Sequence, residues 1–79
     1  MFELTEPQMR ALKVVEAGDC WQRRGGGVNQ VRLDVLLRLM AGGYVRWERP
    51  SDLVETVAIP DLTGKAFLTD RGREVLADA

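Results

Sequence analysis

The sequence predicts a small α+β domain in which three helices accompany a small antiparallel sheet. Three segments combine a helix-capping residue with helical spacing of apolar residues, and the stretch between the last two is rich in alternating and β-branched residues. Helices are expected at about 6–17, 30–41 and 70–78, and strands at about 44–49, 54–59 and 66–68. Because 79 residues can form only one core, we expect a single domain spanning residues 1–79.

The first helix is expected to begin after Thr5, a good N-cap, and Gln8 three residues later completes a capping box. Pro7 lies in the first turn, where its missing N–H costs little. The apolar stripe of this helix consists of Met9, Leu12 and Val15. Gly18 is placed to end the helix, because glycine readily adopts the left-handed conformation after a C-terminus.

Residues 18–28 contain three consecutive glycines, which favour irregular backbone, and a short helical turn is expected around Trp21. Asn29 is then expected to cap the second long helix, 30–41. The pair Gly42-Gly43 supplies its C-terminal stop.

The chain changes character after this second helix. In residues 44–49, apolar and charged side chains alternate after Tyr44 until Pro50 breaks the pattern, and residues 54–59 are rich in β-branched side chains. Residues 60–64 have turn chemistry, and a last short strand is expected at 66–68. Thr69 is expected to cap the closing helix.

Two phrases carry a resemblance to a known family. Residues 39–45, LMAGGYV, lead from a helix through a glycine turn into a strand, and residues 68–76, LTDRGREVL, lead from a strand into a helix. With the order of elements, they resemble the winged-helix (winged helix-turn-helix) domain of small bacterial or phage regulators. The resemblance implies that helix 30–41 is the recognition helix, with Val31, Asp34 and Leu37 facing the major groove. The chain departs from the family in its glycine-rich residues 18–28 and its long, acidic wing, residues 50–64.

Catalytic chemistry finds little support in the sequence. The chain has no histidine, and its single cysteine, Cys20, is expected to be a buried structural thiol beside Trp21. The glycine run 25–27 matches neither a dinucleotide-binding nor a Walker spacing. We therefore expect no enzyme, no catalytic residues, no metal site, no cofactor and no small-molecule substrate.

The second long helix carries more apolar surface than one side of a surface helix needs. On a helical wheel, Gln30, Asp34, Arg38 and Ala41 share one polar sector, while six apolar side chains cover more than half of the circumference. The excess is either core or an exposed patch for a protein partner or a second copy. The candidate partner-binding residues are Leu33, Asp34, Leu37, Arg38 and Met40.

A local basic stripe beside the wing is a second candidate surface. The net charge of −1 lacks the basic footprint of a typical nucleic-acid binder, so any such stripe must be local. The candidate nucleic-acid contacts are Arg23, Arg24, Gln30, Arg46, Arg49 and Lys65. The alternative is that the basic residues are scattered and solvated, since Glu48, Asp52 and Glu55 lie among them.

Two classes of function follow. The sequence favours a small non-catalytic interaction domain whose partner is another protein. An example of such a domain is a phage-type inhibitor, such as an anti-CRISPR protein, that blocks a nucleic-acid-binding machine. The alternative is a winged-helix DNA-binding transcriptional regulator, disfavoured because the acidic charge and Asp34 weaken phosphate contacts. The single cysteine indicates the cytoplasm, and we expect neither a signal peptide nor a membrane span.

Overall fold

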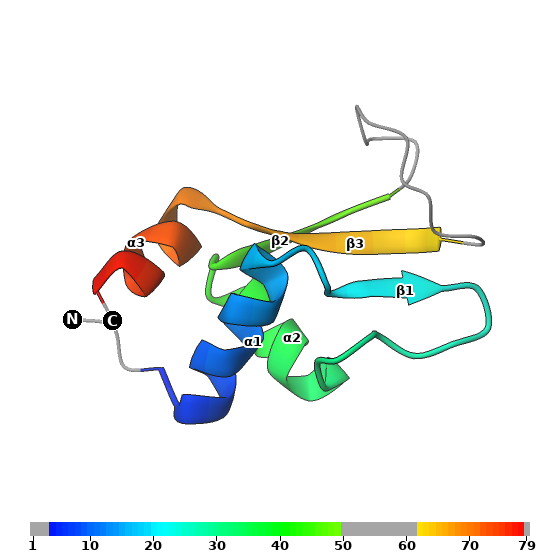
Figure 1. The fold of residues 1–79 in the computed structure, drawn as a ribbon, viewed down its shortest axis with the longest axis horizontal. Coiled ribbons are helices and arrows are strands. Elements are labelled where there is room, and N and C mark those ends of the chain that lie inside the picture. The colour runs from blue at the N-terminus through cyan, green and yellow to red at the C-terminus, as the bar shows by residue number, and fades with distance from the viewer. Residues whose placement is uncertain (1–3, 50–61, 79) are drawn as a thin grey trace.

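The computed structural model describes residues 4–49 and 62–78 (Figure 1). Within these residues, helices and strands alternate in part, which confirms the predicted α+β class. The elements are α1 (Glu6–Glu16), β1 (Trp21–Arg23), α2 (Leu33–Ala41), β2 (Val45–Glu48), β3 (Leu62–Leu68) and α3 (Asp70–Asp78). The predicted strand at 54–59 lies outside the described residues.

The sheet is antiparallel, with strand order β1-β3-β2, so β3 is central. Strand β1 corrects the expectation of a helical turn around Trp21, because Trp21 pairs with Lys65 and the Ala66 N–H donates to the Cys20 carbonyl oxygen. Residues 24–28 then fold back along β1, where Val28 forms a bridge with Gln22. Pairing with a distant strand therefore overrides the local preference of this segment.

Strand β3 is longer than predicted and begins at Leu62 rather than at residue 66. The predicted turn is therefore wrong for residues 62–64. Gly64 is buried in the strand, and a Cβ on it would collide with the indole of Trp47. This glycine admits the close approach of an aromatic ring, a role that glycine often has within strands. Strand β2 lies within the predicted range 44–49.

Helix α1 agrees with its prediction. The Gln8 N–H donates to Thr5 Oγ1 at 3.3 Å, and the Thr5 N–H donates to Gln8 Oε1 at 2.9 Å, which completes the capping box. The helix ends at Glu16, followed by Gly18 at φ = 81°. A residue with a side chain would be strained in that conformation.

Helix α2 begins at Leu33, three residues after the predicted start. Gln30 has φ = 59°, which is incompatible with a right-handed helix, and Asn29 does not act as the cap. The Asn29 side chain instead donates to the Asp19 carbonyl oxygen at 2.9 Å. Arg32 occupies the N-cap position and provides no side-chain hydrogen bond. The predicted C-terminal stop is confirmed, with Gly43 at φ = 80°.

Helix α3 occupies its predicted range and is attached to the turn after α2. Thr69 Oγ1 accepts from the Gly72 N–H at 3.2 Å, as an N-cap does, and its hydroxyl donates to the Gly43 carbonyl oxygen. A Cβ on Gly72 would collide with the Tyr44 carbonyl oxygen. The helix therefore lies directly against the backbone between α2 and β2.

The core lies between the helices and one face of the sheet. Leu12, Leu36, Leu39 and Cys20 are its most completely buried large side chains. Strand β3 contributes Ala66 and Leu68, which alternate with half-buried residues as expected for a strand with one buried face. Figure 1 shows α1 and α2 packed beside the sheet and α3 at the opposite end of the molecule from β1. None of the helices described here is long and apolar enough to cross a membrane.

Candidate interaction surfaces

The exposed side of α2 carries two leucines one turn apart. Leu33 is 57% exposed and Leu37 is 53% exposed, whereas Leu36 and Leu39 on the opposite side are buried. Leu33 and Leu37 are the exposed large hydrophobic residues among those described. The apolar residues of this helix therefore divide into two groups: Leu36 and Leu39 belong to the core, and Leu33 and Leu37 face solvent. We call Leu33, Asp34, Leu37 and Arg38 the α2 face.

The charged members of the α2 face flank the leucines. Asp34 and Arg38 are both exposed, in agreement with the predicted polar sector of the helix. Asp34 Oδ1 lies 3.2 Å from the Arg32 Nε, and both side chains are largely exposed. Because solvent screens such a pair, it contributes little to stability.

Two residues expected at this surface are placed differently. Met40 is half-buried and packs against the core, so it is only partly available to a partner. Val31 is buried at 7% exposure and lies before the helix begins. Its expected position facing a DNA groove is therefore wrong.

A groove of about 460 Å³ runs beside the N-terminal end of α2. Its walls come from α1 and from the segment leading into α2. The lining residues are Pro7, Arg10, Ala11, Val14, Gln30, Val31, Arg32 and Val35. Gln30, predicted as a nucleic-acid contact, thus lines a groove between helices rather than a basic stripe.

Three of the predicted nucleic-acid contacts share one face of the sheet. Arg23, Arg46 and Lys65 come from β1, β2 and β3, and each lies near an aromatic ring of that face. The face is opposite to the one that carries the buried Ala66 and Leu68. We call Trp21, Arg23, Arg46, Glu48, Lys65 and Phe67 the outer sheet face.

The two remaining arginine candidates lie at the ends of strands. Arg24 is exposed in the turn that follows β1, and Arg49 is exposed directly after β2. The strands therefore carry Arg23, Arg46 and Lys65, whereas Arg24 and Arg49 lie just outside them.

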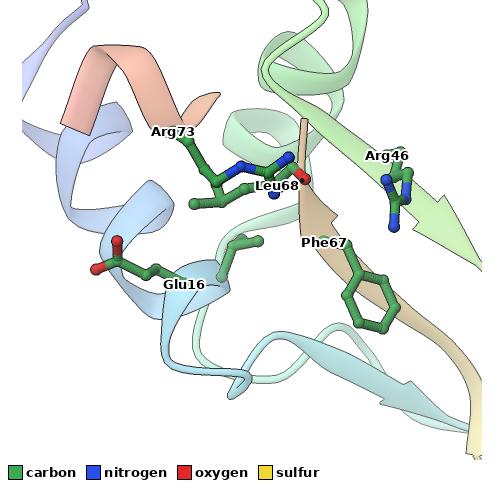
Figure 2. A pocket seen from close by; sticks show the side chains of 6 residues that line it. Glu16, Arg46, Phe67, Leu68 and Arg73 are labelled. Atoms are coloured by element: carbon green, nitrogen blue, oxygen red, sulfur yellow. Dashed lines mark hydrogen bonds between the residues drawn. The ribbon is translucent and has the colours of Figure 1, made fainter. Parts of the chain in front are cut away.

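A hollow of about 230 Å³ lies where the outer sheet face meets the helices (Figure 2). Figure 2 shows Arg46 and Phe67 on the sheet side, with Glu16 from α1 and Arg73 from α3 on the other side. The Glu16 carboxylate points away from Arg46 in this view. Arg73 donates to the Leu68 carbonyl oxygen at 3.2 Å and also pairs with Asp70. The hollow thus brings two guanidinium groups to one end of the face.

The aromatic members of the outer sheet face were not among the predicted site residues. The sequence predicts a helical turn around Trp21, which hides the alternation of Trp21 with Arg23 along a strand. The predicted strand 66–68 includes Phe67 and leaves Lys65 just outside it. The signal in the sequence that could have revealed this face is the alternation of residues 63–68. Small or aliphatic residues there follow polar or aromatic ones, as in a strand with one buried face.

Cys20 is a buried free thiol, as predicted. Burial raises its pKa from 9.0 to about 11, because removal from water disfavours the thiolate. At neutral pH the thiol therefore remains protonated, and a protonated thiol is a poor nucleophile.

Within the described ranges, no group of three or more cysteine, aspartate and glutamate side chains is arranged to hold a metal ion. No protein-family model matches the chain, and comparisons with curated proteins and with solved structures find no match either.

Proposed function

We propose that the chain is a non-catalytic interaction domain that binds another protein through the α2 face. The observation that carries the proposal is the exposure of Leu33 and Leu37 on a helix whose other side is core. Fully burying a leucine side chain contributes about 1.5–3 kcal/mol, and a partner would recover roughly half of this at each position. An amphipathic helix that keeps such a pair in solvent is typical of a docking helix.

The charges beside the leucines support a protein partner over duplex DNA. Asp34 is exposed on the same helix, next to Leu33 in the sequence, and phosphates would repel its carboxylate. In a protein interface, rim charges such as Asp34 and Arg38 provide partner selection and increase the association rate.

Within this proposal, the partner is a nucleic-acid-binding machine that the domain blocks, as phage-type inhibitors such as anti-CRISPR proteins do. The support is the small size of the chain, its net charge of −1 and its lack of histidine. A free thiol at Cys20 fits a reducing compartment such as the cytoplasm.

The second candidate function is a winged-helix DNA-binding regulator. The observation in its favour is the order of elements, in which α2 leads through a glycine turn into two paired strands and then a short helix. In that interpretation α2 would read the major groove. Asp34 and Leu37 are poor groups for reading base edges or phosphates, so we rank this function second.

The test is the variant Leu37→Asp, compared with Leu37→Met and with Ala77→Asp. The first places a charge on the α2 face, the second keeps an apolar side chain there, and the third adds the same charge at an exposed position of α3. Tagged proteins are used for capture from nuclease-treated extract of the source cells, and sedimentation of the purified proteins measures self-association.

We expect Leu37→Asp to lose the captured protein, or to convert a dimer into a monomer, while the helix content and melting temperature are unchanged. The two control variants should behave as the parent chain. Retention of every partner by Leu37→Asp would refute the proposal. Loss of every partner of the parent chain after nuclease treatment would favour the DNA-binding alternative instead.

A further inference from the structure

The outer sheet face places two aromatic rings beside three cations from separate strands. Trp21 and Lys65 are directly paired across β1 and β3, and Arg46 and Phe67 are directly paired across β2 and β3. Residues that face each other in this way project from the same side of an antiparallel sheet. The register therefore places these four residues on one side of the sheet. Arg23 follows a register shift and is placed beside them by its contact with the Trp21 ring.

Each ring lies under at least one cationic group. The Arg23 guanidinium carbon is 5.0 Å from the centre of the Trp21 ring. The Arg46 guanidinium carbon and the Lys65 Nζ are 5.6 Å and 5.5 Å from the centre of the Phe67 ring. Both rings are half-buried, with the cations lying over them. Contacts of this kind contribute about 0.5–2 kcal/mol, so a ligand with a flat π-surface can displace the cation from the ring.

The face has a surplus of positive charge. Among the described residues, Glu48 is the one carboxylate on this face, and it pairs with Arg46 at 2.8 Å. Arg23 and Lys65 form no ion pair with another described residue. All eleven basic residues of the chain lie in the described ranges, together with eight of its twelve acidic residues. The described residues therefore carry a net positive charge, although the whole chain carries −1.

We propose that the outer sheet face binds a single-stranded nucleic acid, with bases stacked on Trp21 and Phe67 and phosphates held by Arg23, Lys65 and Arg46. The cations that now lie over the rings would turn toward the phosphates as bases take their place. This site is separate from the α2 face and goes beyond the proposed function.

The two rings distinguish this ligand from other polyanions. In duplex DNA the flat surfaces of the bases are stacked inside the helix, so the rings would have nothing to contact. An acidic peptide would neutralise the cations and leave both rings unused. A single strand offers phosphates and unpaired bases together, and domains that bind it combine a positive surface with stacking side chains.

The experiment measures fluorescence anisotropy of labelled oligothymidylate and oligouridylate of about 12 nucleotides, within the ~4–16-nucleotide site sizes of single-strand-binding folds. A duplex of equal length and unlabelled polyglutamate serve as the competing polyanions. Titrations at salt concentrations between about 50 and about 150 mM give the salt dependence of the affinity. We expect the single strands to bind more tightly than either competitor.

Two variants separate phosphate contact from stacking. Lys65→Gln should reduce the slope of log K against log salt by about 0.7, the value for one phosphate contact on a single strand. Lys13→Gln, which removes an equal charge at an exposed position of α1, should leave the slope unchanged. Phe67→Leu should weaken binding at least about fivefold without changing the slope, because stacking contributes about 1 kcal/mol or more per base. Melting curves of all three verify the fold.

Tryptophan emission provides a direct readout of stacking. Bound single strands should quench the emission of the parent protein. Trp21→Leu should lose this quenching, although Trp47, which belongs to β2 and pairs with the buried Ala66, remains. The proposal would be overturned if the duplex or polyglutamate bound as tightly as the single strands or more tightly. It would also be overturned if the parent protein did not bind the single strands, or if Lys65→Gln and Phe67→Leu both bound them with the affinity of the parent. Leu37→Asp should bind the oligonucleotides as the parent does, so failure of one proposal is distinguishable from failure of the other.

Discussion

At the scale of single residues, burial decides the chemistry of Cys20. The side chain has no exposed surface, and its backbone carbonyl accepts from Ala66 at the start of the β1–β3 pairing. The thiol is therefore held at the junction between α1 and the sheet. Its pKa, raised to about 11, indicates that the folded state opposes ionisation.

This shift predicts a loss of stability in alkaline solution. Below the unfolded pKa of 9.0, both states keep the proton and the stabilisation is complete. As the pH rises from there toward 11, the unfolded chain loses the proton first, so the free energy of unfolding decreases. Urea denaturation at a series of pH values should show this decrease.

The variant Cys20→Ala provides the comparison for that measurement. It removes the thiol, so the part of the alkaline decrease caused by Cys20 should disappear, although the absolute stability is lower. An identical alkaline decrease in both proteins would contradict the assignment to Cys20.

At the scale of elements, the helices differ in how their N-termini are satisfied. Thr5 and Thr69 each accept a hydrogen bond from a backbone N–H of the helix that follows. Arg32 at the N-cap of α2 makes no such bond. Helix α2 therefore depends on packing of Leu36 and Leu39 rather than on a cap.

We expect Arg32→Ser to stabilise the protein by about 0.5–1 kcal/mol, because the serine hydroxyl can accept from the first turn of α2. The exposed Arg32–Asp34 pair that is lost contributes little. Thermal and urea unfolding measure the change. Arg24→Ser, an equal change in a loop, should have no such effect, and unchanged or lower stability of Arg32→Ser would contradict the assignment of this cap.

At the scale of the whole molecule, a chain of 79 residues has few core side chains to lose. A domain of this size buries a smaller fraction of its surface than larger domains do and is correspondingly marginal in stability. The two sides of α2 show how sharply core and surface are separated, since Leu36 is buried and the adjacent Leu37 is half in solvent.

We expect Leu36→Ala to lower the free energy of unfolding by about 2–5 kcal/mol, because it leaves a cavity in the core. Leu37→Ala should change it by no more than about 0.5 kcal/mol. Urea denaturation at a concentration where both proteins sediment as monomers provides the comparison. Similar losses in the two variants would contradict the separation of α2 into a core side and a binding side.

Local signals in the sequence determined the α+β class, the positions of α1 and α3 and the end of α2. The capping box at Thr5, the Thr69 cap and the stop at Gly43 depend on groups within a few residues, so their spacing suffices to predict them. The exposed polar side of α2 at Asp34 and Arg38 was predictable for the same reason, since it depends only on helical periodicity.

Tertiary structure alone decided β1, the start of α2, the length of β3 and the outer sheet face. Trp21 becomes a strand residue because it pairs with Lys65, and Asn29 leaves its expected cap because its side chain finds the Asp19 carbonyl oxygen. The same pairing brings Trp21, Lys65 and Phe67 to one surface, and Arg23 joins them through its contact with the Trp21 ring. The sequence also did not decide which leucines of α2 stay exposed, because their exposure depends on which segments pack against the helix. Contacts between distant segments leave no local pattern in the sequence.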